Sequence, residues 1–133
     1  MITLHEYVSA SGRCPVREEH DSRSEKVQTN FNVAMEYLVN LPRADWGRPE
    51  VGKLGKQKKG YKGYYEIVFF ADRIQHRPIG FFWPDEQNFV FLLWATEKGD
   101  QLKPDDWRKI ADKRRIAIES GAVRPQLMDL EDL

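Results

Sequence analysis

Three side chains in the second half of the chain could act on an anionic substrate: His76, Arg77 and Lys98. An arginine fork matches two oxygens of a phosphate, so Arg77 suits the stabilisation of negative charge. His76 can accept or donate a proton near neutral pH. Lys98 could stabilise a phosphate or, with a lowered pKa, act as a base.

Each of the three has an ordinary alternative. Arg77 could pair with Glu66 or Asp72 and only support a sheet. His76 could be a packing residue, and Lys98 a solvated turn residue. Because side chains alternate along a strand, His76 and Arg77 are expected on opposite faces unless Pro78 causes a bulge.

A basic loop rich in glycine precedes these residues. Its lysines suit contacts with the backbone phosphates of a nucleic acid, and the tyrosines among them could stack on bases. The lysines are Lys56, Lys58, Lys59 and Lys62, and the tyrosines are Tyr61, Tyr64 and Tyr65. The alternative is a solvated surface loop followed by core tyrosines, and Tyr65 is expected in the core.

The charge of the chain is zero overall but unevenly distributed. Residues 43–77 hold nine Lys and Arg against four Asp and Glu, whereas residues 78–133 hold eight against eleven. The balance excludes a global field that attracts polyanions and favours a local anion site. A lone cysteine, Cys14, and three scattered histidines predict neither a disulfide nor a zinc site, and we expect no cofactor.

The elements that must position these residues follow from periodicity. Residues 2–8 predict a first strand, and Pro15 opens a short helix towards Asp21. From Ser24 to Leu41, apolar residues recur at spacings of four and three, which predicts a helix with one buried face. Strands are expected at about 64–70, 75–82 and 88–96, with a bulge or edge near Pro78 and Gly80, and Pro104 opens a last helix. The segment 43–63 is predicted to be a loop, and the acidic end, residues 122–133, to be loose.

The order is β-α-α-β-β-β-α. It predicts one α+β domain over residues 1–133, in which an antiparallel meander carries N-terminal helices on one face and is followed by a C-terminal helix. The reducing-compartment composition and the lack of a long apolar run predict a cytoplasmic protein without a membrane segment.

That order of elements, together with several short motifs, resembles the RelE/ParE superfamily of bacterial toxins, and within it the HigB-like, phage-derived branch. The motifs that carry the resemblance are Gly12–Val16, Pro49–Leu54, Tyr64–Ile67, Arg77 with Phe81 and Phe82, Glu97–Gly99, and Lys103 with Pro104. The chain differs from the family pattern at Val68, Gly99 and Thr96, where the family has an arginine, a second lysine and an aromatic residue.

The resemblance implies a small RelE/ParE-like sandwich and the toxin of a type II toxin–antitoxin system. Most such toxins cut messenger RNA in the ribosomal A site without a metal ion, and are neutralised by an antitoxin. Arg77 and Lys98, which lie in these motifs, and His76, chosen for its chemistry beside Arg77, are the expected catalytic residues. The residues expected to bind RNA are Lys56, Lys58, Lys59, Lys62, Arg73 and Arg115. The alternative is a non-nuclease binding protein of the same fold, such as a gyrase inhibitor or an inactive phage-derived module.

Overall fold

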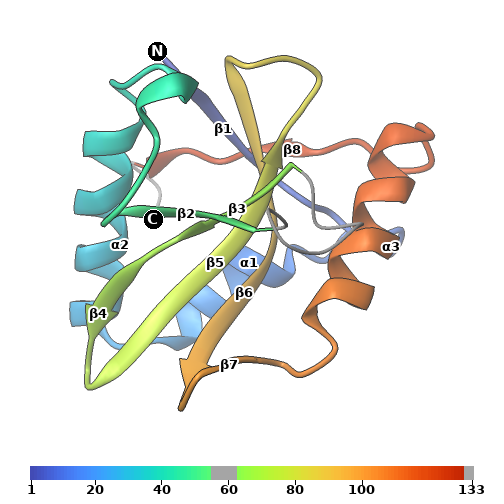
Figure 1. Cartoon of the computed structure of the whole chain (residues 1–133). Coiled ribbons are helices and arrows are strands. Elements are labelled where there is room, and N and C mark those ends of the chain that lie inside the picture. The colour runs from blue at the N-terminus through green and yellow to red at the C-terminus, as the bar shows by residue number, and fades with distance from the viewer. Residues whose placement is uncertain (55–62, 131–133) are drawn as a thin grey trace.

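A twisted sheet forms the middle of the protein, with helices on both of its faces (Figure 1). The computed structural model describes residues 1–54 and 63–130. Within them lie three α-helices, one 3₁₀ turn and eight strands, so the expected α+β class is confirmed. The elements are β1 (Thr3–Glu6), α1 (Pro15–Ser22), α2 (Glu25–Leu38), η1 (Arg43–Asp45), β2 (Val51–Leu54), β3 (Tyr64–Ile67), β4 (Phe69–Ala71), β5 (Ile74–Phe82), β6 (Asn88–Lys98), β7 (Gln101–Lys103), α3 (Trp107–Glu119) and β8 (Gln126–Leu127).

The strand order is β2-β3-β5-β6-β1-β8, with β4 also paired to β5 and β7 to β6. The pairings are antiparallel except that of β1 with β6, which is parallel. The predicted meander therefore forms the centre of the sheet as β3, β5 and β6. Parallel strands need a long connection, and the segment between β1 and β6, which includes α1 and α2, provides it.

Strands β3 and β4 continue one another along β5. Glu66 faces Ile79 and Phe69 faces His76, so the register is the same on both sides of Val68. That register puts Pro78 opposite Ile67, and proline has no N–H to donate to the ladder. The single strand predicted at 64–70 is interrupted at Val68, one residue after the position that Pro78 faces.

A second irregularity lies where the sequence predicted a bulge. The pairing of β5 with β6 shifts register between Ile79 and Gly80. A Cβ atom at Gly80 would lie 2.3 Å from the carbonyl oxygen of Val90, so only glycine allows the strands to approach this closely.

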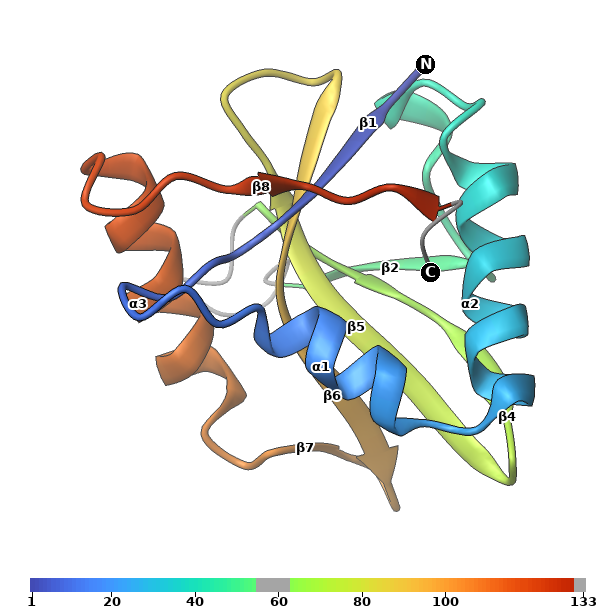
Figure 2. The same cartoon turned by 180° about the vertical axis from the view of Figure 1, so that it is seen from behind.

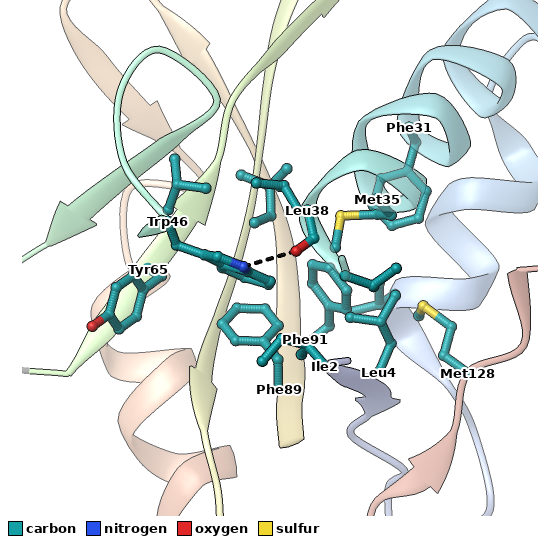
Figure 3. Packing of buried hydrophobic residues seen from close by; sticks show 14 of the residues in the cluster. Ile2, Leu4, Phe31, Met35, Leu38, Trp46, Tyr65, Phe89, Phe91 and Met128 are labelled. Atoms are coloured by element: carbon teal, nitrogen blue, oxygen red, sulfur yellow. Dashed lines mark hydrogen bonds between the residues drawn. The ribbon is translucent and has the colours of Figure 1, made fainter. Parts of the chain in front are cut away.

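Helices α1 and α2 pack on one face of the sheet. The hydroxyl of Ser24 accepts a hydrogen bond from the Val27 N–H and caps α2, which presents Val27, Phe31, Met35 and Leu38 to the core. Figure 3 shows Phe31 and Met35 beside Phe91, and Trp46 donating from its Nε1 to the Leu38 carbonyl at 2.9 Å. The expected helix over 24–41 is thus confirmed, three residues shorter at its end.

Helix α3 packs on the opposite face, with Ala111 and Ile118 buried against Tyr64, Phe81 and Leu92. It begins at Trp107, three residues after the proline that was expected to open it. In Figure 1, α3 lies to one side of β5, and no helix crosses in front of the middle of that strand.

Two expectations differ from the structure. The segment 43–63, predicted as a loop, contains η1 and the edge strand β2. The four residues of β2 include a glycine and show no alternation of apolar and polar side chains, so the sequence did not indicate a strand there. The end of the chain, predicted to be loose, pairs with β1 through β8 (Figure 2) and buries Met128 in the core. Burial of Met128 next to Leu4 stabilises a segment whose acidic composition suggested solvation.

Candidate active site

Two glutamates and two arginines form a cluster on the face of the sheet that α3 only partly covers. Arg77 on β5 donates from Nη1 to Glu66 Oε1 on β3 at 2.7 Å and from Nη2 to Glu97 Oε2 on β6 at 3.2 Å. Arg48, which precedes β2, lies with its Nη2 3.7 Å from Glu66 Oε1. We call these four residues the Glu66–Arg77 cluster.

The sheet register brings the cluster together. Glu66 faces Ile79, and Arg77 is two residues before Ile79, so its side chain leaves the same face as a diagonal neighbour. Arg77 in turn faces Ala95, and Glu97 is two residues beyond Ala95 on β6. Side chains of three neighbouring strands therefore meet without any contribution from a helix.

Gly52 provides the space for the Glu66 carboxylate. Gly52 faces Glu66 across the β2–β3 pair. A Cβ atom at Gly52 would lie 2.6 Å from Glu66 Oε1 and 3.0 Å from Arg48 Nη2. Because Gly52 has no side chain, the Glu66 carboxylate can lie over the edge strand β2, where Arg48 reaches it.

Burial decreases from the middle of the cluster outwards. The side chains are 5% exposed at Glu66, 13% at Arg77, 33% at Glu97 and 66% at Arg48. The Nε of Arg77 is buried and has no hydrogen-bond partner in the described part of the chain. The cluster thus offers a fixed carboxylate flanked by two guanidinium groups and opens to solvent at Arg48 and Glu97.

His76 lies on the opposite face of the sheet, as alternation predicted. Its ring is fully buried, stacks on Phe69 at 5.0 Å between centroids and accepts a hydrogen bond at Nδ1 from Trp94 Nε1 at 3.1 Å. Burial, and then the positive charge of Arg23, lower the pKa of His76. The bulge near Gly80 comes after His76 and does not turn it towards Arg77, so the two residues do not share a site. The structure therefore places His76 as a packing residue in the core, which was the alternative to a catalytic role.

Lys98 and Arg73 are exposed in two turns at the same end of the sheet, because the start of β5 pairs with the end of β6. Lys98 is the last residue of β6 and pairs with Gln101 across the next turn. Arg73 follows Asp72 in the two-residue turn between β4 and β5, where both have positive φ, at 64° and 51°. Asp72 accepts a hydrogen bond from the Ser24 hydroxyl, which ties the turn to the start of α2.

Arg115 is a residue of α3, and its side chain packs on the face of the sheet that also carries the cluster. Its guanidinium is 5.3 Å from the Tyr64 ring centroid and 4.8 Å from that of Phe81, and its Nε donates to Glu119. The Tyr64 hydroxyl donates to Asp112 at 2.6 Å, and burial together with this contact raises the pKa of Tyr64. Tyr64 and Glu66 leave the same face of β3, so Arg115 and the cluster occupy neighbouring stretches of it.

The four lysines predicted to bind RNA, Lys56, Lys58, Lys59 and Lys62, lie outside the described residues, as does Tyr61. Sequence reasoning considered the Glu66–Arg77 pair as an alternative but missed Arg48 and the pairing of Glu97 with Arg77. A signal for Glu97 was present, because it is the only acidic residue near the end of the third predicted strand. Nothing in the sequence indicated Arg48, since its approach depends on the position of β2.

No group of three or more His, Cys, Asp or Glu side chains that could hold a metal ion occurs in residues 1–54 and 63–130. Over the same residues, no helix has the length and apolar character needed to cross a membrane. Comparison with protein-family models, with curated proteins and with solved structures found no match for this chain.

Proposed function

We propose that the protein is the toxin of a type II toxin–antitoxin pair that cleaves messenger RNA on the ribosome in the cytoplasm, and that an antitoxin neutralises it. The observation that carries the proposal is the 2.7 Å contact between a buried glutamate and a partly buried arginine on an accessible sheet face. The order of two helices, an antiparallel meander and a last helix supports the RelE/ParE-like assignment.

The cluster contains two of the groups that RNA cleavage requires. Attack of a 2′-oxygen on the adjacent phosphorus needs a base for the 2′-hydroxyl proton, cations for the charge on the phosphorane, and an acid that protonates the 5′-oxygen as its bond to phosphorus breaks. Glu66 is the proposed base, and Arg77 with Arg48 the proposed cations. A carboxylate held at one position by an arginine needs no rearrangement before it accepts a proton.

Substrate binding would change the partners of Arg77. Its Nη2 contact with Glu97 is the longer of its two contacts, and Glu97 is the more exposed carboxylate. A phosphate that displaced Glu97 would receive a charge-assisted hydrogen bond from Nη2 while Nη1 still held Glu66. Lys98, the residue after Glu97, stays a candidate for further stabilisation of the phosphate.

The experiment is induction of the chain in a bacterium, followed by mapping of mRNA ends. Glu66→Gln keeps the shape of the side chain and removes the base, so cleavage is expected to fall by about two orders of magnitude or more. Glu19→Gln, at a carboxylate on α1 that pairs with Arg23, is the control. Cleavage by Glu66→Gln at the rate of the unchanged protein would exclude Glu66 as the base.

A second candidate is a binding protein of the same fold without nuclease activity. It is favoured by the carboxylates that already occupy both Nη atoms of Arg77 and by exposed apolar side chains on α2 and β4: Val33, Tyr37 and Phe70. In this case induction would arrest growth without cleaved mRNA, and Tyr37→Glu would relieve the arrest while Glu66→Gln would not.

A further inference from the structure

A basic cavity lies between the β1–α1 connection and α3, away from the Glu66–Arg77 cluster. Its volume is about 580 Å³. Its polar and aromatic lining includes Tyr7, Ser9, Ser11, Arg13, Lys113 and Arg114. With Glu18, the lining has three cationic side chains and one carboxylate, a formal excess of two positive charges.

The connection that forms one wall is held in shape by its own hydrogen bonds. The backbone N–H of Arg13 donates to the Ser9 hydroxyl at 3.0 Å, and the hydroxyls of Ser9 and Ser11 are 2.9 Å apart. One hydroxyl hydrogen serves the contact between the two serines, which leaves the other available to a ligand. Arg13 also pairs with Glu18, through contacts of 2.5 and 3.2 Å, and its side chain is 74% exposed, so a ligand can reach its guanidinium.

Helix α3 supplies the other wall and two of the three charges. Arg114 donates from Nη1 to the Leu92 carbonyl at 2.7 Å and lies 5.1 Å from the Tyr7 ring centroid. Burial lowers the pKa of Arg114, because desolvation penalises its charged form, and an anion in the cavity would compensate that loss. Lys113 is exposed and has no hydrogen-bond or ion-pair partner in the described part of the chain.

These groups match a phosphate. Two hydroxyls, the Arg13 guanidinium and Lys113, which has no partner among the described residues, offer several donors to a small tetrahedral anion, against the one carboxylate of Glu18. The volume is that of a small-molecule site and leaves room for a nucleotide around the phosphate. The first turn of α1, whose Pro15 lines the cavity, directs the positive end of its dipole towards the same space.

We propose that this cavity binds a phosphate group of single-stranded RNA, at a nucleotide other than the one held at the Glu66–Arg77 cluster. The identity of the ligand as RNA rests on the proposed function, whereas the phosphate chemistry rests on the cavity alone. Arg115 faces Tyr64 on one flank of α3, and Arg114 faces Tyr7 on the other, so the two sites lie on either side of this helix.

The first experiment tests the phosphate site without RNA. Inorganic phosphate is titrated into the labelled full-length protein, and amide chemical shifts are followed. Saturable shifts are expected at Ser9, Ser11, Arg13 and Lys113, and both Lys113→Ala and Ser11→Ala should weaken binding. Lys53→Ala, at an exposed lysine on β2, is the charge-matched control and should leave binding unchanged. Shifts that do not saturate, or that Lys53→Ala reduces as much as Lys113→Ala, would overturn the site.

The second experiment tests the ligand source. Binding of an oligouridylate is measured against salt concentration by fluorescence anisotropy. Loss of one phosphate contact is expected to flatten the log–log slope by about 0.7 in Lys113→Ala. Adding Lys113→Ala to Glu66→Gln should flatten the slope by the same amount, about 0.7, in a protein whose cleavage is already reduced, which separates this site from the catalytic proposal. Saturable phosphate binding with an unchanged RNA slope in Lys113→Ala would show a free-phosphate site and overturn RNA as the ligand.

Discussion

Glu66 and Arg77 are diagonal neighbours on adjacent strands, and their 2.7 Å contact joins a side chain that is 5% exposed to one that is 13% exposed. Their contact therefore excludes most solvent, unlike that of Arg13 and Glu18, which are 74% and 44% exposed. The two pairs have the same chemistry and provide a matched comparison.

Removal of one partner from the buried pair should destabilise the protein strongly. Arg77→Ala leaves the Glu66 carboxylate, among the described residues, with the 3.7 Å ion pair to Arg48 alone, and breaking a buried pair costs about 3–5 kcal/mol. A double-mutant cycle of Glu66→Ala and Arg77→Ala, measured by urea denaturation, should give a large coupling energy. The same cycle for Arg13 and Glu18 should give less than about 1 kcal/mol. Equal coupling in both cycles would contradict the burial argument.

Gly52→Ala should displace the Glu66 carboxylate while the fold persists. The new methyl group would lie 2.6 Å from Glu66 Oε1, and such overpacking costs about 1–3 kcal/mol. The proposed cleavage should fall with it, because Glu66 no longer keeps its position against Arg77. Gly47→Ala is the control, since nothing lies within 4 Å of a Cβ atom there. Full cleavage by Gly52→Ala would show that the carboxylate position is not required.

His76→Phe should remove part of the acid sensitivity of folding. Because burial lowers the pKa of His76, the folded state binds fewer protons than the unfolded chain. The stability that His76 contributes is therefore complete above its ordinary pKa of about 6.5 and declines as the pH falls through that value towards the lower folded pKa.

The difference in stability between His76→Phe and the unchanged protein should therefore depend on pH. At pH 8 His76→Phe should be less stable by about 1–3 kcal/mol, because the Trp94 N–H loses its acceptor. Between pH 7 and pH 5 the difference should shrink as the unchanged protein loses stability. Denaturation curves at several pH values measure it, and a constant difference would contradict the linkage.

Met128→Ala should show that the end of the described chain belongs to the core. Met128 is 4% exposed and its N–H donates to the Leu4 carbonyl at 2.9 Å. Truncation of a buried methionine costs about 2–5 kcal/mol. Leu127→Ala, at a neighbour that is 60% exposed, should cost less than about 0.5 kcal/mol. Similar losses in both variants would mean that β8 does not dock in solution.

The sequence by itself determined the elements that have a clear period. The apolar spacing from Val27 to Leu38 specified α2 and its buried face, and the aromatic runs specified the meander of β3, β5 and β6. Alternation along β5 also separated His76 from Arg77. These features depend on residues close in the chain, so they can be inferred without a partner.

Only the tertiary structure decided which distant segments meet. The parallel pairing of β1 with β6 joins Thr3 to Asn88, and β8 pairs with β1 although its sequence is polar and short. Arg48 reaches Glu66 because β2 docks on β3, and Ser9 reaches the cavity beside Lys113 because β1 places the connection against α3. Such contacts depend on packing between residues far apart in sequence, and that packing leaves no local period to read.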